Sequence, residues 1–221
     1  WFYHQLDKSG KWYGKVVNPG ETPELTRFIM NTWSGIYRRD FLEEHRIRHH
    51  ETPGAAFQDN GFFWQTFIYA KRAMFLNEPY YLNRRDNPNS SVNSREKIYC
   101  MNDEYAYIRQ IFDQPGNEVL WERFKTYFRL KQFYNYMFTL GRIGDGYRKE
   151  YVQKISREFV QYRENGELDL GLLAGESLKK ARMLMDQPER FYETYGTYRN
   201  SEGTAGFETA ADKRVRELET S

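Results

Sequence analysis

Residues 57–64 read FQDNGFFW, and this short stretch decides how the front half of the chain is interpreted. One acid, Asp59, stands directly before a run of aromatic residues. Asp59 or Asn60 occupies the place of a helix N-cap. Apolar residues then recur at helical spacing: Phe63, Phe67, Ala70 and Met74. The pattern predicts a helix from about residue 60 to residue 74.

The segments around this helix predict mixed α/β structure. Aromatic and β-branched runs in residues 1–17 flank a turn at residues 7–10, which is typical of a β-hairpin. Residues 25–42 have the apolar spacing of short helices. Residues 73–84 predict two short strands, and a polar loop follows at residues 84–94. Polar loops of this kind often carry binding or catalytic residues.

The back of the chain predicts helices from Tyr99 almost to the end. Turn-forming residues mark breaks near residues 113–117, 141–146, 164–171 and 186–188. The chain therefore divides into a mixed region at residues 1–98, a helical extension at 99–200 and a polar tail at 201–221.

Composition restricts the class of protein. The 221 residues carry a net charge of +2, so nothing in the overall charge predicts binding to nucleic acid. Aromatic residues make up 18% of a chain whose mean hydropathy is −0.89, which is typical of a soluble protein with an aromatic core. Cys100 is the only cysteine and excludes an internal disulfide, in keeping with a reducing compartment. The chain opens at Trp1 within a strand-like run, so we expect further sequence before it.

Three stretches together resemble one enzyme family. They are a Trp before IYRRDFL (36–42), an acid before Phe inside QDNGFF (58–63), and YYLNRRDNPNSS (80–91). In order and spacing, roughly residues 30 to 95 are similar to the acceptor side of family-2 glycosyltransferases. These are GT-A-fold enzymes of bacterial surface-polysaccharide synthesis in the cell envelope.

The resemblance implies an α/β fold. It implies a partial GT-A (Rossmann-like) domain at residues 1–98 that lacks its N-terminal nucleotide-binding half. The helical extension would follow. It also implies inverting transfer of a sugar from a nucleotide-sugar donor to a saccharide or lipid-linked acceptor. In that reaction Asp59 is the general base, and this chain alone is expected to be inactive. The family usually has Glu-Asp at this place, whereas here the pair is Gln58-Asp59.

The remaining candidates for substrate binding each have a structural alternative. A guanidinium fork suits a departing diphosphate, but loop arginines also pair with surface acids. Trp33 could stack on a sugar or lie in the core, and Arg38 could face the acceptor or solvent. Asp59 itself could serve only as a helix cap. The full set of candidates for substrate binding is Trp33, Arg38, Gln58, Arg84, Arg85, Asn87, Ser90 and Ser91.

Metal binding by this chain is not expected. The family holds a divalent metal, Mg²⁺ or Mn²⁺, through an Asp-x-Asp motif that this chain lacks. His45 and His49 stand four residues apart, which would suit a metal only on one helix face and with a third ligand.

Residues 122–163 carry ten Lys or Arg against four acids, interleaved with aromatic residues. Such a helix can lie on an anionic membrane, or it can pack on the domain with its charges solvated. We therefore expect a cytoplasmic location, at the inner face of the cell membrane if the first alternative holds. A different reading of the whole chain is a non-catalytic carbohydrate-binding or interaction module.

Overall fold

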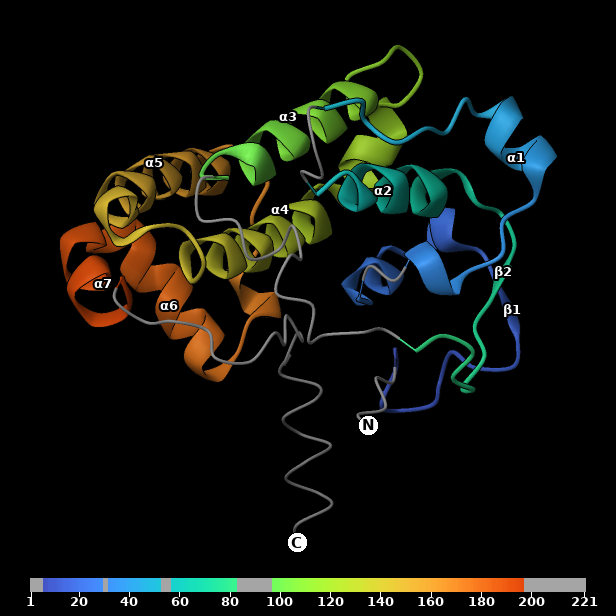
Figure 1. Ribbon diagram of the computed structural model, residues 1–221, viewed down its shortest axis with the longest axis horizontal. Helices are drawn as coiled ribbons and strands as arrows, with labels where there is room; N and C mark the ends of the chain where they lie inside the picture. Colours follow the sequence, from blue (N-terminus) through green and yellow to red (C-terminus); the bar gives the residue numbers. More distant parts are fainter. Residues whose placement is uncertain (1–5, 30–31, 53–56, 83–96, 197–221) are drawn as a thin grey trace, which may run out of the picture. The chain divides into compact units, whose positions relative to one another are not determined.

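The computed structural model describes residues 6–29, 32–52, 57–82 and 97–196 (Figure 1). These residues form two compact units, and the boundary between the units falls between Tyr127 and Phe128. Helices dominate both units, and the described residues contain one sheet of two short strands. The expected α/β GT-A domain is therefore wrong, because no Rossmann-like sheet is present in the described part of the chain.

The first unit has short elements followed by longer helices. They are β1 (Val16–Val17), the 3-10 turns at Pro19–Glu21, Pro23–Arg27 and Thr32–Ser34, α1 (Arg39–Glu44), α2 (Asp59–Tyr69), β2 (Ala73–Met74) and α3 (Cys100–Phe112). β1 pairs antiparallel with β2, with Val16 opposite Met74 and Val17 opposite Ala73. Strands far apart in the sequence therefore pair. The first strand of the hairpin predicted in residues 1–17 lies mostly in residues 1–5, outside the described residues.

Local hydrogen bonding explains why the predicted strands are so short. The Asp7 carboxylate accepts hydrogen bonds from the backbone N–H groups of Ser9 and Trp12, so the turn holds its own donors. Pro19 and Pro23 each start a 3-10 turn directly after β1. These residues convert β-prone sequence into turns.

The helix predicted from about residue 60 to residue 74 is shorter than expected. α2 begins at Asp59 and ends at Tyr69, and the last two predicted positions, Ala73 and Met74, belong to β2. The core of this unit forms where α2 packs against α3. Trp64 is 0% exposed, and its ring meets the ring of Phe112 at 6.0 Å. Burial of these large rings fixes the start of α2 relative to α3.

The second unit is helical, as predicted. α4 (Glu118–Leu140) runs into it from the first unit, and α5 (Asp145–Glu164), α6 (Gly175–Asp186) and α7 (Pro188–Tyr195) follow. The breaks between these helices fall at the places that the sequence predicts. Figure 1 shows α5, α6 and α7 in mutual contact. Phe133 of α4 packs edge-on against Phe159 of α5 at 5.7 Å.

The second unit also contains a largely buried ion pair between Arg129 and Glu167. Arg129 binds the Glu167 carboxylate through Nε at 2.7 Å and lies 3.5 Å over the ring of Tyr162. Its Nη1 donates to Gln132 at 2.8 Å. The guanidinium is thus bonded on several sides, as a buried charge requires.

Several cations of the basic stretch at residues 122–163 have partners within the second unit. Arg148 is buried and donates to the carbonyl of Gly196, while Lys149 pairs with Glu189. Arg163 pairs with Asp186 in the same way. Arg148 is therefore packed inside the unit, and membrane binding by this stretch stays a prediction. No helix in the described part of the chain combines the length and apolar character needed to cross a membrane.

Candidate functional site

Asp59 is the first residue of α2 and is half-buried. The N-cap position belongs to Gln58, whose side chain makes no capping hydrogen bond. Asp59 therefore lies in the first turn of α2 and not at the N-cap position itself. Its Oδ1 accepts a hydrogen bond from the Asn60 side chain at 3.2 Å. Phe57, two residues before Asp59, has φ of 68°, a conformation that bulky residues rarely adopt and that recurs at functional sites.

Aromatic rings flank the start of α2. Phe62 meets Tyr37 edge-on at 5.1 Å and stacks on His49 at 4.6 Å. Burial raises the pKa of Asp59 above its ordinary value, while the hydrogen bonds of Asn60 and the charge of His49 act in the opposite direction. A carboxylate with a raised pKa is a stronger base than a fully solvated one. The geometry thus provides a partly desolvated base at one helix end.

A second carboxylate, which the sequence analysis missed, lies beside this helix end. Glu104 of α3 is 1% exposed; its Oε1 accepts a hydrogen bond from the Gly61 N–H at 2.8 Å. Its Oε2 lies 2.9 Å from Nδ1 of His50. Burial raises the pKa of Glu104, the negative charge of Asp59 adds to that effect, and the bonds from His50 and Gly61 oppose it. We call Asp59, His49, His50 and Glu104 the Asp59 cluster.

Gly61 is what allows Glu104 to come so close. A Cβ at position 61 would lie 2.4 Å from Glu104 Oε1, a distance that van der Waals contact forbids. A signal for Glu104 was present in the sequence. Glu104 shares the helical spacing of the buried residues Met101, Tyr105 and Ile108. A buried acid on an apolar helix face needs a hydrogen-bond or charge partner.

Gln58 supports the loop before α2. Its side-chain amide donates to the Thr52 hydroxyl at 2.6 Å. The backbone carbonyl oxygen of Gln58 lies 3.3 Å from Nδ1 of His49. Gln58 therefore contacts one member of the Asp59 cluster.

The other candidates lie elsewhere on the unit. Trp33 is 42% exposed and meets the ring of Tyr81 at 6.3 Å, so it is a surface residue and the core alternative is wrong. Arg38 is 82% exposed and pairs with Asp40, which favours the solvated alternative. The remaining candidates, Arg84, Arg85, Asn87, Ser90 and Ser91, fall outside the described residues.

His45 and His49, whose spacing would suit a metal, stack on two different aromatic rings. His45 follows the last residue of α1 and stacks on Tyr69 at 4.8 Å, whereas His49 stacks on Phe62. Across residues 6–29, 32–52, 57–82 and 97–196, no three His, Cys, Asp or Glu side chains gather closely enough to hold a metal ion.

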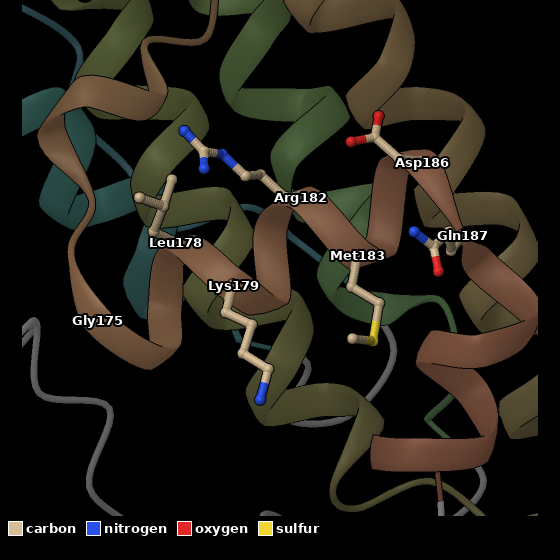
Figure 2. Close-up of a pocket in the computed structure, with 7 residues that line it drawn as sticks. All are labelled: Gly175, Leu178, Lys179, Arg182, Met183, Asp186 and Gln187. Atoms are coloured by element: carbon tan, nitrogen blue, oxygen red, sulfur yellow. The ribbon is translucent and has the colours of Figure 1, made fainter.

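A depression of about 490 Å³ lies in the second unit, between Gly175 and Gln187 (Figure 2). All its lining residues come from α6 and its two ends, and Figure 2 shows Lys179 and Arg182 extending in different directions. Asp186 is already paired with Arg163. The depression is an open groove along one helix, without convergent polar groups. We therefore take the Asp59 cluster as the candidate functional site.

Comparisons of the chain with protein-family models, with characterised proteins and with solved structures give no match.

Proposed function

We propose that the chain supplies the base of an inverting glycosyl transfer from a nucleotide-sugar donor. The observation that carries this proposal is the half-buried Asp59 carboxylate at the start of α2, whose pKa is raised by burial. The resemblance of residues 30–95 to family-2 glycosyltransferases gives the reaction class. The described residues contain no nucleotide-binding sheet, so the proposal rests on the cluster and not on the fold.

The reaction needs a base because a sugar hydroxyl is a weak nucleophile. Asp59 accepts the proton of the acceptor hydroxyl as its oxygen bonds to the anomeric carbon of the donor. The bond between that carbon and the diphosphate oxygen breaks, and the nucleoside diphosphate leaves with the electron pair from the opposite face. A positioned base contributes about 10²–10⁴ in rate.

The surroundings of Asp59 support this role. Phe62 and Tyr37 form an edge-on ring pair near this helix end, and burial raises the pKa of the Tyr37 hydroxyl as well. His49 is exposed and lies on Phe62, so a polar group is available at the rim. An ionised base with partial desolvation is the arrangement that proton abstraction requires.

The test is sugar transfer by the protein, measured with a panel of nucleotide-sugar donors and glycan acceptors. Asp59→Asn removes the base and keeps the shape and a polar group. We expect kcat to fall by about 10²–10⁴ while donor binding stays unchanged. Asp103→Asn is the matched control, because Asp103 is an exposed acid in the first turn of α3. Equal activity of Asp59→Asn and Asp103→Asn would show that Asp59 is not the base.

A second function, glycan binding without catalysis, is favoured by the ring pair of Trp33 and Tyr81. Both rings are exposed and in contact, and sugar rings stack on such surfaces. Trp33→Ala should then weaken glycan retention on an array whether or not Asp59 is present. A glycan profile unchanged by Trp33→Ala would remove this alternative.

A further inference from the structure

The Glu104–His50 pair fixes which ring nitrogen of His50 carries a proton. Nδ1 lies 2.9 Å from Glu104 Oε2, and the other carboxylate oxygen is occupied by the Gly61 N–H. An ionised carboxylate only accepts hydrogen bonds, so Nδ1 is the donor to Glu104 and carries the proton. In the neutral ring, Nε2 then has the lone pair and accepts hydrogen bonds.

The ring itself is held in place from a second direction. It stacks on Tyr107 with centroids 4.0 Å apart and planes inclined by 5°. The His50 side chain is still 27% exposed, whereas Glu104 is buried beneath it. Among the described residues no hydrogen bond occupies Nε2. A buried carboxylate thus orients an accessible imidazole, as in acid–base and ligand-binding sites on other folds.

The pair is attached to the same helix end as Asp59. Glu104 binds the backbone of Gly61, two residues after Asp59, and the charge of Asp59 acts on Glu104. Glu104 therefore links the His50 ring to the helix end that carries Asp59, and the Asp59 carboxylate and Nε2 of His50 form a pair of hydrogen-bond acceptors. Such a pair complements hydroxyl groups and repels phosphate or carboxylate groups, which carry no donor.

We propose that His50 is an acceptor-binding residue of the Asp59 cluster, with Glu104 as its positioning residue. Nε2 accepts a hydrogen bond from a second hydroxyl group of the substrate whose first hydroxyl is activated by Asp59. The ligand class is a neutral polyhydroxyl portion of a saccharide, and not an anionic headgroup. The identity of the ligand rests on the proposed function, whereas the state of the His50 ring does not.

The first test measures the ring state without any activity. The chain is labelled with ¹⁵N-histidine, and two-bond nitrogen–proton correlations are recorded at a pH where the rings are neutral. His50→Gln identifies the His50 signals. We expect the proton on Nδ1 in the wild type. In Glu104→Gln the amide oxygen stays with the buried Gly61 N–H and the NH₂ faces His50, so the proton moves to Nε2. A proton on Nε2 in the wild type would overturn the proposal.

The second test uses the transfer reaction of the natural protein. His50→Leu removes one hydrogen bond to a neutral hydroxyl, so the acceptor KM should rise about two- to tenfold while kcat changes little. His50→Gln retains an accepting oxygen and should recover part of the loss. His45→Leu is the control, because His45 stacks on Tyr69 outside the cluster. An unchanged acceptor KM in His50→Leu would overturn the role of His50. Full activity of Asp59→Asn would instead refute the proposed function and leave the ring state as measured.

Discussion

Gly61→Ala tests how tightly α2 and α3 are joined at the Asp59 cluster. Gly61 is the third residue of α2, and Ala has the higher helix propensity by about 1 kcal/mol. Propensity alone therefore predicts a more stable protein. The structure predicts the opposite, because the new Cβ would lie 2.4 Å from Oε1 of Glu104.

The size of the effect follows from what Glu104 would lose. Its carboxylate has little freedom to retreat, since it is buried and bonded to His50 as well as to the Gly61 N–H. A hydrogen bond to a charged group contributes about 1.5–3 kcal/mol. Subtracting the helix gain of about 1 kcal/mol leaves a net loss of about 0.5–2 kcal/mol.

Urea denaturation followed by circular dichroism measures this difference in the free energy of unfolding. Gly146→Ala is the matched control: Gly146 lies in the first turn of α5, and nothing is found within 4 Å of its added Cβ. We expect Gly146→Ala to be neutral or stabilising and Gly61→Ala to be destabilising. The reasoning is refuted if Gly61→Ala stabilises the protein as Gly146→Ala does.

Three further results are expected. Burial raises the pKa of both Asp59 and Glu104, so their favourable contribution is present at low pH and is lost as pH rises through the raised values. Urea denaturation from about pH 4 to pH 7 should therefore show a smaller loss of stability in Asp59→Asn than in the wild type, and identical slopes would contradict this. Glu167→Ala leaves the buried Arg129 guanidinium without its carboxylate and should cost about 3–5 kcal/mol in the free energy of unfolding, whereas a loss below about 1 kcal/mol would mean that the pair is solvated. Trp64→Ala empties the core between α2 and α3 and should cost about 3–5 kcal/mol in the same measurement; a loss near zero would place Trp64 outside the core.

The helical back of the chain could be predicted because its signals are local. Gly116, Gly144 and Gly166 lie in the predicted breaks, and Gly116 and Gly166 have positive φ values, a conformation that glycine adopts readily. Apolar residues such as Phe133 and Phe159 mark the buried faces at helical spacing. Local residue chemistry was sufficient there.

The front half could not be predicted in the same way. Aromatic runs near Trp12 and Tyr80 have high strand propensity, but propensity is overridden where side chains such as Asp7 take the backbone donors. The pairing of Val16 with Met74 joins residues far apart in the sequence, and no local pattern encodes it. Long-range contacts decided the outcome.

The candidate site shows the same division. Asp59 was predicted as the base through the resemblance, and this stays a prediction, whereas Glu104 comes near it only through the packing of α3 on α2. His50 was passed over because a histidine in a loop carries no spacing signal. Its role depends on Glu104 and Tyr107, which are distant in the chain.

The pH dependence of kcat/KM for sugar transfer tests the central role of Asp59 most directly. The account predicts that the rate rises with pH as one carboxylate ionises, with a midpoint above the ordinary value for aspartate, because burial raises the pKa of Asp59. In Asp59→Asn this limb should disappear and the plateau should fall by about 10²–10⁴. A variant that kept both the limb and the plateau of the wild type would contradict the account.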